Sequence, residues 1–318
     1  MTHITNPLAS AEQLYLRNSF GSLPNDLQDV VCYATQCLTQ AAGILLQLPQ
    51  SVTAQANVVL ARYWLAESRL IMTSEFSDVS AACIFLVSKL GPRPRSARDI
   101  SNVYAYLLSS NSSFFCNKGT EPPSHDSRSC YLSEAEYYAF HSRVLALEAR
   151  ILYSLSFDTH VALPHPLAIT YLQALEFCNH QPREEISKRV LEYLNTALLS
   201  PQLLYLTHQP NMLAVAAIYT AAIDVGAKMP ECEWWEVFDV EREELGFLVV
   251  AMRSLEGWVR KQKEEFAWLS HGMVTRRKVQ TELKERGISD GNGAQGEDEE
   301  DVLMKQMGEK ATQLEAQS

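Results

Sequence analysis

The feature that most constrains this sequence is one apolar stretch, residues 76–90, which reads FSDVSAACIFLVSKL. It is apolar on nearly every face over about four helical turns, and a helix of that kind must be buried. Small residues fill its first half and bulky residues its second, so neighbouring helices can approach closely at one end and interdigitate at the other. We expect it to be the centre of a helical bundle and to end at Gly91-Pro92.

Both charges in this stretch are explained by the helix itself. Lys89 lies in the last turn, where a cation complements the carboxyl end of the helix dipole and its stem can lie along apolar surface. Asp78 lies near the start, where a carboxylate suits the unpaired amides and the positive end of the dipole. From residue type alone, neither charge requires a partner protein.

The composition is that of an ordinary soluble globular protein. The chain has 318 residues, of which 47% are hydrophobic and 20% charged, and this length predicts two domains of about 150 residues each. Its formal net charge of −11 argues against a broad nucleic-acid-binding surface but leaves room for a local basic patch. The beginning lacks the features of a secretory signal, and no apolar run is long enough to span a membrane. We therefore expect an intracellular protein whose cysteines, Cys83 and Cys178 among them, are mostly small core residues.

Apolar residues at three-four spacing predict helices on both sides of the central stretch. In the first half they are expected at about 25–48, 51–68, 76–90, 96–109 and 133–155. In the second half they are expected at about 167–178, 183–199, 211–225 and 240–261, with a short aromatic segment around 234–235. Residues 1–24 are interpreted as a mobile arm or a short packing helix, and residues 110–131 as a surface loop.

Two of these helices share one pattern. Residues 82–88 (ACIFLVS) align with residues 216–222 (AAIYTAA), since both begin with small residues, become bulky and are followed by a glycine. This similarity predicts a duplicated helical domain with one central helix in each copy, although two Ala-rich helices can also match by chance. Lys89 falls opposite Ile223, so any task of that charge belongs to the first copy.

The helical pattern decays from about residue 263 onward. The sequence passes through the basic triplet 276–278 to the acidic run 297–301 and a Gln/Glu-rich end. A segment of low hydrophobicity with clustered like charges is typically solvated and flexible. The basic triplet is compatible with a nuclear import signal, but three basic residues are a weak one.

No catalytic or metal-binding motif stands out. The sequence lacks a Gly-rich phosphate loop, a Gly-x-Ser-x-Gly turn, a His-Glu-x-x-His helix and a Cys-x-x-Cys pair. Cys116, His125 and Cys130 supply three donors without a close pair, which does not meet the usual spacing of a zinc site. We expect no catalytic residue, no metal and no cofactor, and therefore a binding or regulatory protein rather than an enzyme.

The motifs together resemble the cyclin family, and specifically the cyclin L type. The resemblance covers about residues 25–260 and rests on AACIFLVSK in the central stretch, on QAAGILLQLPQ at 40–50 and on shorter matches at 94–95, 98–99, 160–161, 165 and 171–176. It implies an all-α fold of two tandem five-helix cyclin-box domains, at 25–158 (with loop 110–131) and 159–262. An N-terminal arm (1–24) and a flexible acidic tail (263–318) would flank them.

The resemblance also implies a function. A protein of this family is a non-catalytic subunit that binds and activates a cyclin-dependent kinase, here in transcription by RNA polymerase II and pre-mRNA splicing, and hence in the nucleus. Lys89 and Glu148 match the lysine and glutamate that cyclins direct at the kinase's mobile helix, and Leu90, Leu152 and Phe157 match apolar contact positions. Without the resemblance these three are equally well read as core residues. Such a surface would favour the active kinase by binding that arrangement more tightly.

The sequence departs from the family pattern in three places. Gly91-Pro92 stands where two acidic residues are usual, residues 110–131 have no match, and a short acidic tail replaces the long Arg/Ser-rich tail of many cyclin L proteins.

The alternative function is a cyclin-fold adaptor in transcription that binds its partners without activating a kinase. A helical enzyme would need a catalytic group that we do not find. The expected partners are a kinase and transcription or splicing factors, with neither a membrane nor direct nucleic-acid binding.

Overall fold

The computed structural model describes residues 5–91, 93–109, 112, 131–175, 183–270 and 273–288. Within these ranges the regular structure is entirely helical, as the sequence predicted. Most of the predicted loop 110–131, together with Cys178 and the acidic run 297–301, lies outside the described residues. None of the described helices is long and apolar enough to cross a membrane.

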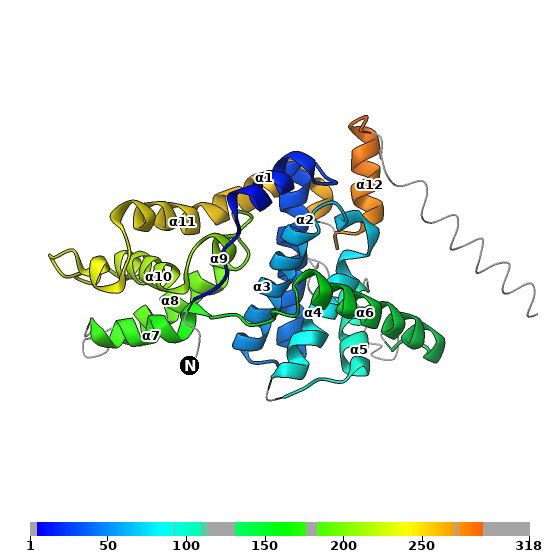
Figure 1. The fold of residues 1–318 in the computed structure, drawn as a ribbon, viewed down its shortest axis with the longest axis horizontal. Helices are drawn as coiled ribbons and strands as arrows, with labels where there is room; N and C mark the ends of the chain where they lie inside the picture. Colours follow the sequence, from blue (N-terminus) through cyan, green and yellow to red (C-terminus); the bar gives the residue numbers. More distant parts are fainter. Residues whose placement is uncertain are drawn as a thin grey trace, which may run out of the picture. The chain divides into compact units, whose positions relative to one another are not determined.

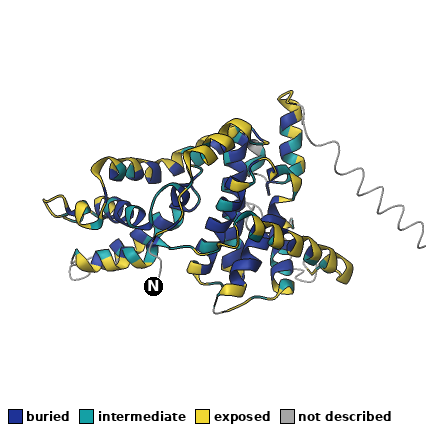
Figure 2. Ribbon diagram, in the orientation of Figure 1, coloured by how far each residue is buried: buried dark blue, intermediate teal, exposed yellow. Residues whose placement is uncertain are grey.

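The first helix group is organised around α4, which has the predicted bounds Phe76–Leu90. The other members are α2 (Asn25–Leu45), α3 (Gln50–Ala66), α5 (Ala97–Leu108) and α6 (Glu134–Ser154). All four pack against α4 (Figure 1), and every residue of α4 from Phe76 to Ser88 is buried (Figure 2). The predicted burial of the central helix is therefore confirmed.

A chain of buried hydroxyl groups explains a polar residue in the small half of α4. Ser80 Oγ lies 2.7 Å from Thr39 Oγ1 of α2 and 2.6 Å from Tyr104 Oη of α5. All three side chains are buried, and a buried hydroxyl is costly unless it is hydrogen-bonded. The chain of contacts joins three helices at one depth of the core.

The second helix group repeats this arrangement around α10 (Pro210–Val225). Its members are α7 (Pro164–Ala174), α8 (Arg183–Ala197), the single turn α9 (Leu204–Thr207) and α11 (Arg242–Glu265). α10 packs against each of them and against the short helix η4 (Trp234–Phe238), which is the predicted aromatic segment. α10 ends at Gly226, whose φ of 69° is the left-handed conformation that favours glycine.

Two predictions for this group were inaccurate. α7 begins at Pro164 rather than near residue 167, because proline at the start of a helix has a suitable φ and needs no hydrogen-bond acceptor. α9 was not predicted, since one turn is too short to show a periodic pattern.

α3 contributes to the cores of both groups. Trp64 packs edge-on against Phe76 at the start of α4, with ring centroids 6.3 Å apart. On its other side Ala54, Val58 and Ala61 lie in the apolar core of the second group. Residues 1–275 accordingly form one compact unit, and the division into two boxes between residues 158 and 159 stays a prediction.

The described part of the N-terminal segment is a packed helix, the second of the two alternatives considered for it. α1 (Ala11–Phe20) begins with a capping box between Ser10 and Gln13, and the buried Arg17 pairs with Asp29 of α2. Ahead of this helix, Asn6 hydrogen-bonds the carbonyl oxygen of Ala162 at 2.8 Å. The arm is thereby attached to both helix groups.

Part of the region expected to be a flexible tail is helical. α11 continues to Glu265 and is followed by η5 (Ala267–Ser270), and a second unit begins with α12 (Arg276–Glu285). These residues are helical, and the flexibility expected from residue 263 onward stays a prediction. α12 consists largely of strong helix formers, and an ion pair of 2.9 Å between Glu282 and Arg286 joins its last turn to the residue that follows.

Candidate functional site

An ion pair joins the end of α4 to α6. Lys89 Nζ lies 2.7 Å from both carboxylate oxygens of Glu148, which is 59 residues away in the sequence. The same ammonium group lies 3.7 Å from the centroid of the Phe85 ring. The Lys89 side chain is 40% exposed and that of Glu148 13%. Lys89 therefore does more than complement a helix dipole, because a carboxylate and an aromatic ring hold it at the rim of the first group.

A second ion pair fixes the other end of α4 against the same helix. Arg143 Nε of α6 donates to Asp78 Oδ2 at 2.7 Å, and the Asp78 side chain is almost fully buried. Asp78 lies in the first turn of α4, as predicted, but its carboxylate is bound to α6 rather than to the helix's own amides. The two pairs together set how α6 lies across α4.

Three apolar residues that are not fully buried follow Lys89 and Glu148 in the sequence. Leu90 follows Lys89 and is 60% exposed, and Phe157, just beyond α6, is 70% exposed. Leu152, one turn after Glu148, is half-buried. Of the three apolar positions predicted as kinase contacts, two are thus clearly outside the core.

The backbone around Phe157 is in an unusual conformation. Ser156 and Phe157 have φ values of 50° and 62°, and the amide of Phe157 donates to the Leu152 carbonyl oxygen at 2.8 Å. The left-handed region costs a non-glycine residue roughly 1–2 kcal/mol. Such a cost persists only where the surrounding structure imposes it, and here the imposed conformation leaves an aromatic side chain in solvent.

Two further exposed residues extend this surface along α6. Tyr138 and Leu145 are exposed and precede Leu152 at intervals of seven residues. Glu148 lies between Leu145 and Leu152 on the same side of the helix. Neither residue was among the predicted contacts. Their seven-residue spacing was the available signal, but it cannot distinguish an exposed stripe from a buried one.

The cysteines of α2 and α4 are buried or half-buried thiols. Burial raises the pKa of the Cys32 and Cys37 thiols to about 11, and Cys83 is fully buried in α4, so these thiols stay protonated at neutral pH. In the described part of the chain no three His, Cys, Asp or Glu side chains gather as a metal site would require. Cys116, His125 and Cys130 lie outside the described residues.

Comparison with known sequences places the chain in a family. No family model matches it. A cyclin-L1-like protein of Schizosaccharomyces pombe is 30% identical over 251 residues, which are 79% of this chain and 90% of that protein. The chain belongs to the cyclin L family. Human cyclin-L1 is 31% identical over 256 residues, but this cyclin spans only 44% of its length.

Two solved complexes contain chains with the same fold. The crystal structure of the yeast RNA polymerase II CTD kinase CTDK-1 complex contains a chain that matches with a TM-score of 0.62 at 15% identity, covering 93% of this cyclin and 88% of that chain. A CAK complex from Chaetomium thermophilum bound to ATP-γ-S gives 0.54 at 15% identity, covering 92% and 94%. The predicted all-α cyclin fold is confirmed. Membership of the cyclin L family supports the expected role as a regulator of a cyclin-dependent kinase.

Proposed function

We propose that this cyclin binds a cyclin-dependent kinase through the rim of its first helix group and favours the kinase's active state. The observation that carries the proposal is the Lys89–Glu148 pair, held beside exposed Leu90 and followed on the chain by exposed Phe157. We call these four residues with Leu152 the kinase-binding surface.

The chemistry of the kinase-binding surface suits a protein partner. A partly exposed ammonium group and a carboxylate can hydrogen-bond backbone groups of a docked helix, while the apolar side chains supply buried area. Burying one such side chain fully contributes roughly 1.5–3 kcal/mol before the costs of association. Because α6 is fixed to α4 by two ion pairs, the surface is ordered before the partner arrives.

The biological setting is also part of the proposal. One of the solved complexes with this fold is named as an RNA polymerase II CTD kinase, which supports transcription as the process. A contribution to pre-mRNA splicing, a nuclear location, the absence of catalysis by the chain itself and partners among transcription or splicing factors follow from the family resemblance.

The test is affinity capture of the full chain from its native cells, with kinase activity measured in the eluate. A Lys89→Glu, Glu148→Lys variant retains an intramolecular ion pair but reverses the charges presented to a partner. The matched control reverses Asp224 and Arg253, the corresponding pair between α10 and α11 in the second group. Circular dichroism would verify that both variants are folded.

We expect the first reversal to remove at least about nine-tenths of the captured kinase activity, and the control reversal to leave it unchanged. Disrupting an interaction at the centre of an interface commonly costs about 2 kcal/mol or more, which is roughly a thirtyfold loss of affinity. If both variants capture as much kinase activity as the wild-type chain, or if folded wild-type chain captures no kinase, the proposal is contradicted and the adaptor alternative is favoured.

A further inference from the structure

Three arginines that follow Lys89 and Leu90 in the sequence have no carboxylate partner among the described residues. We call Arg93, Arg95 and Arg98 the arginine cluster. Arg93 and Arg95 lie in the connection after α4, and Arg98 lies in the first turn of α5. In the part of the chain that the structure describes, none of the three forms an ion pair, whereas Arg17, Lys89, Arg143 and Arg253 each do. In a chain of net charge −11 this is a local excess of positive charge.

The carboxylate nearest to the arginine cluster in the sequence, that of Asp99, hydrogen-bonds Ser96 at the start of α5. Asp99 Oδ2 accepts from the backbone amide of Ser96 at 3.3 Å and from its hydroxyl group at 2.8 Å, which completes the capping box of α5. Arg95 is half-buried and donates to the Gln47 carbonyl oxygen at 3.3 Å. Arg93 and Arg98 are exposed, so they are the two members of the cluster that an anionic ligand can reach.

A row of aromatic rings connects Arg98 to Lys89. The Arg98 guanidinium lies 4.2 Å from the Tyr137 ring centroid, and Tyr137 stacks on His141 with centroids 5.7 Å apart. His141 meets Phe85 at 6.5 Å, and Lys89 Nζ lies over the other end of the row. The row runs from α5 through α6 to α4 and holds one cation at each end.

The arrangement favours phosphate groups over nucleic-acid bases as ligands. A base would need a free aromatic face, but one side of Tyr137 carries Arg98 and its ring stacks on His141. Arginine side chains bind phosphate oxygens in a bidentate manner, and such charge-assisted hydrogen bonds are strong. Exposed arginines without a carboxylate partner are therefore suited to a phosphorylated peptide.

We propose that Arg93 and Arg98 bind a phosphorylated segment of the same kinase that docks on the kinase-binding surface, an inference that rests on the proposed function. Lys89 belongs both to that surface and to the ring row, so the row links the site where the kinase docks to Arg98. Activation segments of kinases are ordered by new contacts between arginines and a phosphorylated residue. The cluster supplies such arginines from the regulatory subunit.

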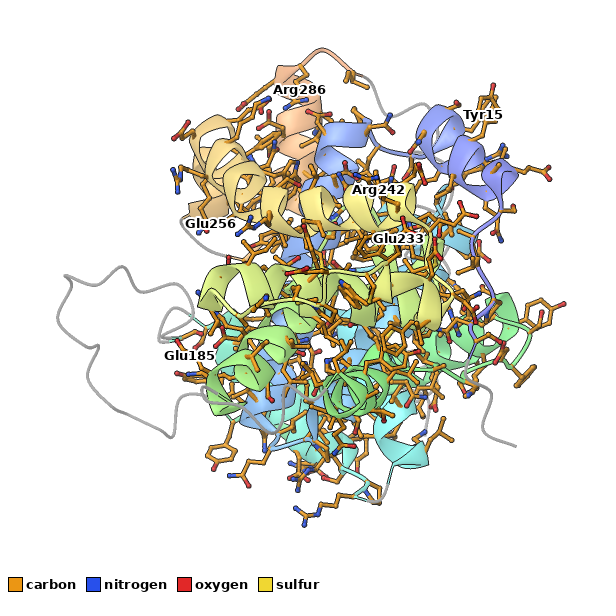
Figure 3. The ribbon with its side chains drawn as sticks, turned by 90° about the vertical axis from the view of Figure 1, so that its left-hand side faces the viewer. Tyr15, Glu185, Glu233, Arg242, Glu256 and Arg286 are labelled. Carbon is orange, nitrogen blue, oxygen red and sulfur yellow. The ribbon has the colours of Figure 1, made fainter. Side chains whose placement is uncertain are left out.

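The experiment uses complexes captured by the full chain from native cells. Each eluate is divided, and one part is treated with phosphatase, one with ribonuclease and one with buffer before a salt wash. The retained kinase is quantified by mass spectrometry. The variant is Arg93→Ala, Arg98→Ala, and the control is Arg242→Ala, Lys261→Ala, which removes the same charge from α11 (Figure 3 labels Arg242).

We expect phosphatase to lower retention of the kinase by wild-type chain roughly tenfold, as removal of a close charge pair does. The double alanine variant should retain the kinase at that lower level whether or not phosphatase is added, and the control should behave as wild type. Arg93→Lys, Arg98→Lys keeps the charge and should show an intermediate loss, which tests the bidentate contact even if the alanine variant folds poorly.

Two outcomes would overturn the inference while the proposed function stands: phosphatase has no effect on wild-type chain, or the alanine variant retains the phosphorylated kinase fully. Release by ribonuclease instead of phosphatase would overturn it in favour of RNA. If folded wild-type chain captures no kinase at all, the proposed function itself fails.

Discussion

At the scale of single residues, the block at 40–50 that characterises the cyclin L resemblance has a packing reason for its glycine. Gly43 lies where α2 meets α3, and a methyl group in its place would meet Thr53 Oγ1 and lie 2.5 Å from Thr53 Cγ2. Thr53 is buried and β-branched, so it cannot move aside cheaply. The glycine sets how closely the two helices approach.

Gly43→Ala should therefore destabilise the protein by roughly 1–3 kcal/mol, because the clash outweighs the better helix propensity of alanine. The measurement is urea unfolding at equilibrium. Adding Thr53→Ala should restore most of the stability. Gly257→Ala is the matched control: it lies in α11 with open space around it and should be neutral or stabilising by up to about 1 kcal/mol. A Gly43→Ala chain as stable as wild type would refute this account.

At the scale of elements, a small polar network joins α3, α7 and α8. Asn195 Oδ1 accepts from Gln50 Nε2 at 2.9 Å and lies 3.0 Å from His165 Nε2, which is assigned as the protonated ring nitrogen for that reason. His165 Nδ1 is buried without a partner among the described residues. Burial lowers the pKa of His165, since a second proton would place an unpaired charge inside the protein.

This network predicts a stability that falls in weak acid. A histidine whose pKa is lower in the folded than in the unfolded protein does not reduce stability well above the unfolded pKa of 6.5. As the pH falls below that value, the unfolded chain binds a proton that the folded chain does not, so the free energy of unfolding decreases. Burial lowers the pKa of His208 in the same direction. His165→Gln should flatten, and not abolish, the fall in unfolding free energy between about pH 7 and pH 5.

Denaturant unfolding at several pH values would measure how the free energy of unfolding depends on pH. The control is a substitution at an exposed histidine, His160→Gln, which should leave the wild-type pH dependence. A His165→Gln chain with an unchanged pH profile would show that this network does not carry the effect.

At the scale of the whole molecule, the unit formed by residues 1–275 should unfold in one transition although two helix groups are present. α3 is buried on both sides, so loss of either core exposes apolar surface of the other. We expect calorimetric and van't Hoff enthalpies to agree for this unit. Val58→Ala, on the side of α3 that faces the second group, should destabilise the unit by roughly 1–3 kcal/mol and leave a single transition. Two separate transitions would contradict this expectation.

The sequence predicted most of the elements because the signals for them are local. The buried character of 76–90 and the stop after Leu90 both depend on residues within a few turns of each other. Short pieces such as α9, and α12 in a charged region, lacked a long enough pattern. The resemblance named Lys89 and Glu148 together, but spacing alone does not relate them.

The amino-acid sequence by itself thus determined the helical class, the central helices and membership of the cyclin L family, because periodicity and family motifs are written along the chain. Tertiary structure decided which distant side chains meet. The Lys89–Glu148 pair, the ring row from Arg98 to Lys89 and the two-sided burial of α3 each join residues from separate helices. Their energies depend on distances across the packed interior, and no local pattern encodes those distances.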